Sequence, residues 1–229
     1  MIMFLYFRAN LILRGCPMTN NELDEILSLL KPGETVLIEY TQDSPYELLL
    51  WLLVRWALDR GRAVLVDDVL DTFPEVLARL DVLGFDLSGF EDIPVVKIGG
   101  SRSAGRVIGT IDVDRHSIDF RYYERIYSKV SNDLMLNPVL GFHKLFLVLT
   151  DKELLRLIRN VAGFVGKKDR IALYLVNSDV MASKSGGFGA LFREIATTVL
   201  ALYPTERGYV LGVVKTSRRE LLGKEVVIL

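Results

Sequence analysis

The stretch PGETVLIEYTQDSPYELLLWLLVRWALDRGRAVLVDD, residues 32–68, decides the predicted fold. Residues 35–40 have the length and apolar character of a buried strand, and Ser44 and Pro45 begin a leucine-rich helix that continues to about residue 60. Residues 63–66 form a second unbroken apolar run, which is the pattern of a parallel strand covered on both faces by helices. The stretch therefore predicts a strand–helix–strand unit of an α/β domain.

The rest of the chain continues this alternation and predicts one domain over residues 18–229, preceded by an apolar N-terminal extension, residues 1–17. Repeated units with short connections indicate a doubly wound, mainly parallel sheet whose last strands turn antiparallel at one edge. The further helices are expected at about 19–30, 73–83, 122–136 and 153–165. The further strands are expected at 95–98, 145–149 and 171–176, in a hairpin of 107–113 with 117–120, and at 197–202, 209–216 and 225–229.

Composition excludes several classes of function. Half of the 229 residues are hydrophobic, and 28 basic against 29 acidic residues give a net charge of −1, so the overall balance does not point to nucleic acid. A single cysteine, Cys16, excludes an internal disulfide and fits a reducing cytoplasm. With only His116 and His143, a histidine-rich metal site is not expected.

The apolar extension is too short and too interrupted to predict a membrane span. Arg8 and Asn10 divide residues 1–17, and neither half approaches the roughly 20 apolar residues that a spanning helix needs. We therefore expect an upstream extension, an added strand or a contact arm, and an apolar arm would favour self-association.

The turn between the first strand and its helix carries no phosphate-binding loop. A P-loop has the pattern G-x-x-x-x-G-K-[ST], in which glycine-rich backbone, lysine and hydroxyl hold the phosphates and magnesium. Residues 39–46 read EYTQDSPY, with no glycine, no lysine and two acids that would repel a triphosphate. This turn argues against a phosphate site.

Five segments together resemble RecA-like ATPases, most closely the KaiC and RadA branch. They are PGETVLIEY (32–40), GRAVLVDD (61–68), FLVLTD (146–151), IALYLVNSD (171–179) and YVLGVVKTSR (209–218). The chain also resembles a small family of uncharacterised archaeal proteins that look like degenerate KaiC domains. The likeness covers residues 19–229 and implies a three-layer α/β/α fold.

The resemblance implies roles for residues outside the turn. In KaiC-like proteins an acidic pair after the second strand activates water, and Asp67 and Asp68 match that position. An aspartate that ends a later apolar strand acts on the magnesium ligands, and Asp151 is the nearest match. A lysine and an arginine near the C-terminal strand reach the neighbouring subunit's phosphate, and Lys215 and Arg218 resemble them.

Acids at strand ends have two interpretations. Asp67, Asp68, Asp151 and Asp179 could line one crevice at the rim where doubly wound sheets bind ligands, and such carboxylates would suit Mg²⁺ or Mn²⁺. Alternatively, they cap the helices that follow. We favour capping and predict no metal site.

A glycine- and serine-rich loop carries Lys97, Arg102 and Arg106. Its backbone N–H groups and positive charges could cradle a phosphate or a nucleic-acid backbone. The alternative is a solvated connection, which we favour because no aromatic residues are interleaved for base stacking.

These observations favour a catalytically inactive RecA/KaiC-like domain of the cytoplasm, without a cofactor, that binds itself or a protein partner. One alternative is an enzyme or sensor that binds nucleotide weakly, with magnesium on Asp67, Asp68 and Asp151. A second is a nucleic-acid accessory factor of the RadA type. The residues expected to contact a ligand in the nucleotide alternative are Tyr40, Thr41, Gln42, Ser44, Lys215 and Arg218.

Overall fold

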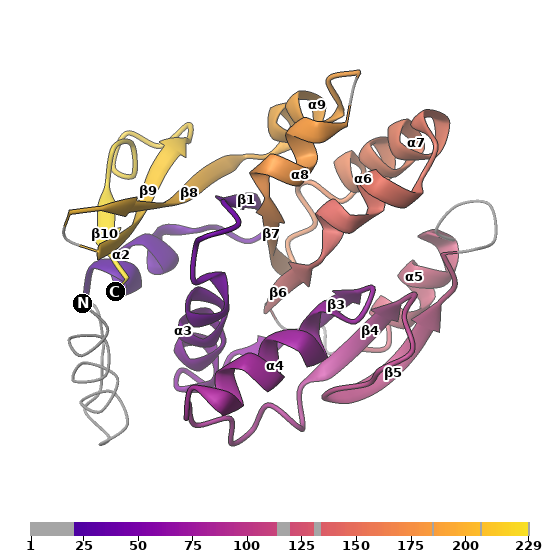
Figure 1. The fold of residues 1–229 in the computed structure, drawn as a ribbon, viewed down its shortest axis with the longest axis horizontal. Coiled ribbons are helices and arrows are strands. Elements are labelled where there is room, and N and C mark those ends of the chain that lie inside the picture. Colours follow the sequence, from indigo (N-terminus) through magenta and orange to yellow (C-terminus); the bar gives the residue numbers. More distant parts are fainter. Residues whose placement is uncertain (1–20, 114–119, 131–133, 185, 207, 229) are drawn as a thin grey trace.

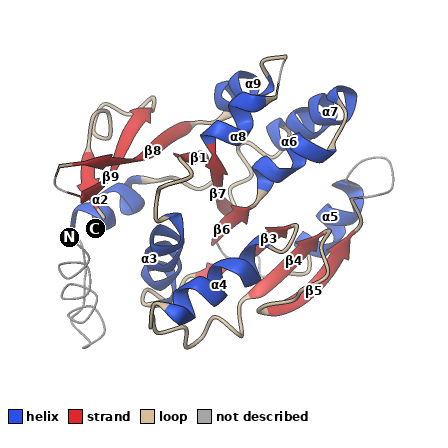
Figure 2. Cartoon of the chain, viewed as in Figure 1, coloured by secondary structure: helices blue, strands red, loops and turns tan. Residues whose placement is uncertain are grey.

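The computed structural model describes residues 21–113, 120–130, 134–184, 186–206 and 208–228. Their strands form one sheet in the order β10-β9-β8-β1-β7-β6-β3-β4-β5, and β2 adds to it by pairing with β6. Figure 1 shows this sheet running through the molecule with helices on both sides, and Figure 2 shows the same view by secondary structure.

The predicted pattern of strand directions is confirmed. Strand β1 pairs in parallel with β7 and β8, and the parallel pairing continues through β6, β3, β4 and β5. Strand β9 is antiparallel to both β8 and β10. The strands are β1 (Thr35–Tyr40), β2 (Ala63–Val64), β3 (Val66–Val69), β4 (Pro94–Ile98), β5 (Arg106–Ile111), β6 (Met135–Leu140), β7 (Arg170–Asn177), β8 (Thr198–Thr205), β9 (Gly208–Lys215) and β10 (Glu225–Val227).

Two hydrophobic cores lie on the two faces of the sheet. Helices α2, α3 and α4 pack on one face, and α5 to α9 with the short helix η1 pack on the other. This is the three-layer arrangement that the sequence predicts. The helices are α2 (Asn21–Leu29), α3 (Tyr46–Leu58), α4 (Thr72–Val82), α5 (Phe120–Tyr127), η1 (Phe142–Lys144), α6 (Leu145–Val148), α7 (Asp151–Ala162), α8 (Ser178–Ser183) and α9 (Phe188–Ile195).

The helix predicted at 122–136 is found only as far as Tyr127, and the strand predicted at 145–149 is wrong, for a shared reason. Strand β6 lies in the sheet between β3 and β7, and residues 145–148, predicted as part of a strand, form helix α6 instead. The sequence of β6, MLNPVL, contains Asn137 and Pro138, which are depleted in strands and hide the strand pattern. Helix α5 accordingly ends at Tyr127.

The predicted hairpin is also wrong in the part that can be seen. Strand β5 pairs in parallel with β4, and Phe120, expected in the second arm, begins helix α5. Residues 117–119 of that arm, His116 and the N-terminal extension 1–17 lie outside the described residues. Among the helices of the described segments, none is long and apolar enough to cross a membrane.

Candidate functional site at the carboxyl edge of the sheet

The turn that follows β1 is closed by its own hydrogen bonds. The Thr41 amide donates to Ser44 Oγ at 3.2 Å, and the Ser44 amide donates to the Thr41 carbonyl at 3.0 Å. The Tyr46 amide donates to the Ser44 carbonyl at 2.8 Å, and Pro45 has no N–H to offer. A phosphate needs several backbone N–H groups that converge on it, and here these groups already have acceptors.

Neighbouring elements hold the same turn in place. The Gln42 amide donates to Asp179 Oδ2 at 3.4 Å, and Ser44 Oγ donates to a carbonyl of β8 at 3.4 Å. The hydroxyl of Tyr209, on β9, donates to the Asp43 carbonyl at 2.8 Å. The structure therefore brings the predicted ligand residues Thr41, Gln42 and Ser44 together, but as parts of one tethered turn.

Aromatic side chains fill the space beside the turn. The rings of Tyr40 and Tyr46 stack with centroids 4.2 Å apart and planes 9° apart, and the guanidinium of Arg79 lies 5.2 Å from the Tyr46 centroid. The rings of Tyr40 and His143 form a T-shaped pair with centroids 6.0 Å apart. Burial, followed by the positive charge of Lys144, lowers the pKa of His143 to about 4, so this imidazole is neutral at pH 7.

The two acids that match the water-activating pair lie inside β3 and point to opposite faces of the sheet. Alternation along a strand separates neighbours in this way. Asp68 Oδ1 accepts the Phe73 amide at 2.8 Å at the start of α4, as the capping alternative requires, and Asp68 Oδ2 lies 4.0 Å from Lys97 Nζ. Burial raises the pKa of Asp68 above its ordinary value. Asp67 and Asp68 therefore share no site.

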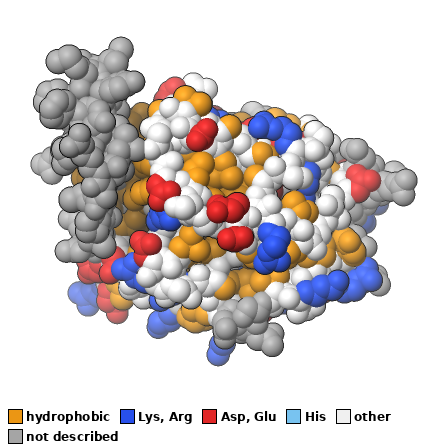
Figure 3. All heavy atoms as spheres, turned by 90° about the horizontal axis from the view of Figure 1, so that it is seen from below, with side chains coloured by type: hydrophobic (Ala, Val, Ile, Leu, Met, Phe, Trp, Pro, Cys, Tyr) orange, Lys and Arg blue, Asp and Glu red, His pale blue; other side chains and the backbone are white. Residues whose placement is uncertain are grey.

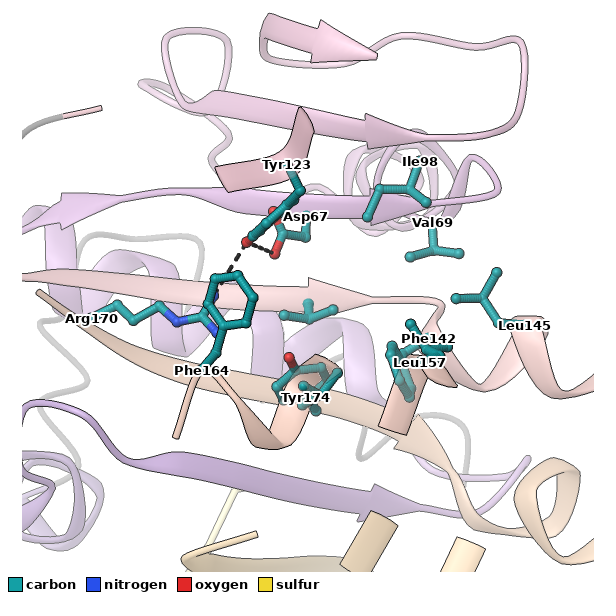
Figure 4. A pocket seen from close by; sticks show the side chains of 12 residues that line it. Asp67, Val69, Ile98, Tyr123, Phe142, Leu145, Leu157, Phe164, Arg170 and Tyr174 are labelled. Atoms are coloured by element: carbon teal, nitrogen blue, oxygen red, sulfur yellow. Dashed lines mark hydrogen bonds between the residues drawn. The ribbon is translucent and has the colours of Figure 1, made fainter. Parts of the chain in front are cut away.

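Asp67 belongs instead to a buried polar cluster beneath α5 (Figure 4). The Tyr123 hydroxyl donates to Asp67 Oδ2 at 2.7 Å, and Asn137 Nδ2 donates to it at 3.3 Å. Arg170 Nη1 donates to Asn137 Oδ1 at 2.8 Å and to the Tyr123 hydroxyl at 3.2 Å. Asp67 Oδ1 is buried without a partner in the part of the chain that the structure describes, and burial raises the pKa of Asp67 to about 6, although Arg170 opposes that rise.

A small cavity of about 30 Å³ opens beside this cluster. Its volume suits one or two water molecules, which need about 10–15 Å³ each, and is far too small for a nucleotide. Figure 4 shows Asp67, Tyr123 and Arg170 at one end, with the Phe164 ring beside Arg170, and apolar side chains at the other end. The side chains around it are those of Asp67, Val69, Ile98, Tyr123, Val139, Phe142, Leu145, Leu157, Val161, Phe164, Arg170 and Tyr174.

The remaining match to a metal-ligand position, Asp151, lies away from the other acids. It is the first residue of α7, its carboxylate is exposed, and Lys184 Nζ lies 3.3 Å away. The helix is capped by Thr150 with Glu153 in a reciprocal capping box. Among the described residues, no group of three or more acids, histidines or cysteines could hold a metal ion.

The two C-terminal basic residues already have partners within the chain. Lys215 Nζ donates to the carbonyls of Arg193, Glu194 and Ala196 at 2.8–2.9 Å, where helix α9 ends. Arg218 forms an ion pair with Glu34, just before β1. Both positive charges are therefore engaged by groups other than those of the turn after β1.

The loop after β4 contains a feature that the sequence did not reveal. Lys97 points into the protein and forms an ion pair with Asp71, while the Ser101 and Arg102 amides donate to the Asp71 carboxylate at 2.8 and 3.0 Å. Desolvation raises the pKa of Asp71, but these hydrogen bonds outweigh it and lower the pKa to about 2. Arg106 is exposed at the start of β5. A pattern search could not find Asp71, because its partners lie 26 to 31 residues away.

Comparison with known proteins agrees with this architecture. The family model described as a Pyrococcus protein of unknown function, DUF257, matches residues 25–227. The chain belongs to the DUF257 family. A protein from Pyrococcus horikoshii OT3, solved in a structural study, is 35% identical to this DUF257 chain with a TM-score of 0.81, over 90% of this chain and 98% of that one. A search of curated proteins finds no match.

More distant structures show the fold of this DUF257 protein. A KaiC-like protein from Pyrococcus horikoshii OT3 has a TM-score of 0.58 at 13% identity, covering 85% of this chain and 84% of that one. The flagellar accessory protein FlaH from Methanocaldococcus jannaschii has a TM-score of 0.56 at 13% identity, covering 87% and 86%. The predicted RecA/KaiC-like fold is therefore confirmed.

Proposed function

We propose that this protein is a RecA/KaiC-like domain that does not hydrolyse nucleotides and works by binding protein, either a second copy of itself or a different partner. The observation that carries the proposal is the turn after β1. Its Thr41, Ser44 and Tyr46 amides donate within the turn, and its Gln42 amide donates to Asp179. A phosphate could bind there only after these bonds broke.

The charges around the turn support the same conclusion. Asp43 is part of the turn, Asp179 contacts it, and Glu47 follows in the first turn of α3. A triphosphate would meet these acids while Lys215 and Arg218 remain bound to other groups.

Exposed apolar side chains support a role in protein binding. Leu147 and Val148 on α6 are 64% and 57% exposed, and Leu155 on the following helix α7 is 45% exposed. Leu147 and Val148 are neighbours on one short helix, and adjacent exposed apolar side chains are typical of contact sites. The face shown in Figure 3 instead has hydrophobic, acidic and basic side chains interspersed.

A titration with ATP, ADP and Mg²⁺ tests the absence of a nucleotide site. A ligand at 100 times its Kd stabilises the native state by about 2.7 kcal/mol, which a calorimetric Tm detects easily. We expect no change in Tm at millimolar nucleotide, either in the wild type or in Ser44→Ala, which frees the Thr41 amide. A magnesium-dependent rise in the wild-type Tm would overturn the proposal.

Light scattering after gel filtration, followed by affinity capture, tests the binding role. We expect a mass above the 25.9 kDa of one chain, or a defined complex with a partner. Leu147→Glu should weaken that assembly, whereas Lys152→Glu, an exposed polar position on α7, should leave it unchanged. A strict monomer that captures no partner would refute this part.

A further inference from the structure

The loop after β4 folds around a carboxylate of its own chain. The Ser101 amide donates to Asp71 Oδ2 at 2.8 Å, and the Arg102 amide donates to Asp71 Oδ1 at 3.0 Å. Lys97 Nζ also donates to Oδ1 and to the Arg102 carbonyl. Two consecutive amides and one ammonium group thus converge on one anion.

The backbone of this loop is shaped for that anion. Gly99 and Gly100 have φ values of 69° and 77°, which bring the following amides to one side. A Cβ on Gly100 would lie 2.2 Å from Asp71 Oδ1, so only glycine leaves room for the carboxylate. Successive N–H groups arranged in this way form an anion-binding nest.

The charge at the nest suits a single negative charge. The Lys97 side chain is 7% exposed, and besides Asp71 it has Asp68 at 4.0 Å. A buried ammonium group strongly favours a nearby anion. A dianion such as phosphate would place a second negative charge near Asp68, so a monocarboxylate fits better.

Asp71 occupies the nest close to solvent, from a left-handed backbone conformation. Its side chain is 15% exposed, so the nest lies close to solvent. Leu70 and Asp71 both have positive φ, 51° and 61°, a conformation that costs Leu70 about 1–2 kcal/mol and that aspartate adopts more readily. The nest also lies at the carboxyl ends of β3 and β4, the edge at which doubly wound sheets bind ligands.

We propose that Lys97 and the loop Gly99–Arg102 form a carboxylate-binding site that Asp71 occupies in cis. An external monocarboxylate takes the same donors when the Asp71 side chain is absent or withdrawn. The site does not depend on the proposed protein-binding role or on any nucleotide.

Chemical rescue of Asp71→Gly tests this site. Glycine opens the nest and adopts the left-handed backbone without strain. We expect a lower Tm in chloride and a recovery of about 4 °C in sodium formate at ten times its Kd and equal ionic strength. If the variant is unfolded in chloride, formate should restore the folded state. Phosphate should rescue less than formate.

Three matched variants give the controls. Asp71→Asn fills the nest with an uncharged group that tolerates the same backbone, and should not respond to formate. Asp71→Gly/Lys97→Met should lose the rescue because the ammonium donor is gone. Asp81→Ala removes an exposed aspartate from α4 and should behave like the wild type.

Two results would overturn the proposal. One is an Asp71→Gly variant that responds to formate no more than Asp81→Ala does. The other is a formate response whose amide chemical-shift changes, measured by NMR, leave Ser101 and Arg102 unaffected. Either result would leave the proposed protein-binding function standing, since the rescue requires no partner.

Discussion

Replacing Asp67 by Asn is expected to stabilise this protein at neutral pH. The carboxylate of Asp67 is buried, its Oδ1 has no partner among the described residues, and Arg170, whose charge acts on it, donates its hydrogen bonds to Tyr123 and Asn137. Burial therefore raises the pKa of Asp67 from 3.8 to about 6. Asparagine keeps the shape of the protonated acid and never has to carry a buried charge.

The magnitude follows from the two pKa values. A folded-state pKa above that of the unfolded chain means that the folded state prefers the protonated acid. The stabilisation of the folded state that comes from this preference is fully present below pH 3.8 and is lost as the pH rises through about 6. The difference between 3.8 and about 6 corresponds to about 3 kcal/mol at pH 7. Asp67→Asn should recover this less about 1 kcal/mol for the amide N–H groups that replace the unpartnered Oδ1, leaving about 2 kcal/mol and a Tm rise of roughly 4–8 °C for a domain of this size.

Urea unfolding between pH 4 and 7 measures the effect. As the pH rises from 4 to 7, Asp67 should lower the free energy of unfolding of the wild type by about 2 kcal/mol. The Asp67→Asn variant should not show this decrease. Asp151→Asn is the control, because it removes an exposed carboxylate whose ion pair contributes at most about 1 kcal/mol. An Asp67→Asn variant that is less stable than the wild type at pH 7, with an unchanged pH dependence, would refute the reasoning.

Three further predictions concern stability in urea. Gly141→Ala should lower the free energy of unfolding by about 3 kcal/mol or more, because a Cβ there would lie 2.1 Å from Thr72 Oγ1. Gly166→Ala, whose Cβ would meet none of the described atoms within 4 Å, should lower it by only about 1 kcal/mol because of the positive φ. Equal losses in the two variants would contradict this prediction. Lys215→Met should cost about 2 kcal/mol by leaving three carbonyls at the end of α9 without their donor, and an unchanged urea midpoint would mean that water replaces it. Thr150→Val should cost about 1 kcal/mol by removing the cap of α7, and a loss below a few tenths would show that the capping box contributes little.

Much of the fold could be predicted from the sequence because strong local patterns carry it. The apolar runs of β1 and β7, the capped or glycine-terminated helices and the closing strands were all placed close to their observed positions. The sequence does not predict strand β6, because Asn137 interrupts its apolar pattern. The Asn137 side chain is needed there for hydrogen bonds to the Leu65 carbonyl and to Arg170 in the buried cluster. Here a polar requirement of the tertiary structure overrides local propensity.

The candidate sites were less predictable, because contacts between distant segments define them. The sequence placed Asp67 and Asp68 together, but their positions within β3 send them to opposite faces. It also presented Lys97, Arg102 and Arg106 as one basic loop, whereas Lys97 turns inward to Asp71. Tyr123 and Arg170 had no recognisable pattern, since Tyr123 donates to Asp67 and accepts from Arg170 only after folding brings these distant segments together.

By itself, the sequence determined the class of fold, the absence of P-loop residues at the turn after β1 and the lack of a cysteine-based metal site. These properties depend on residue identity and short-range periodicity, which can be read along the chain. Only the tertiary structure decided which amides are already bonded, which acids are buried and which carboxylate fills the nest after β4. Hydrogen bonding and desolvation depend on neighbours that folding brings from elsewhere in the chain, so local sequence does not contain them.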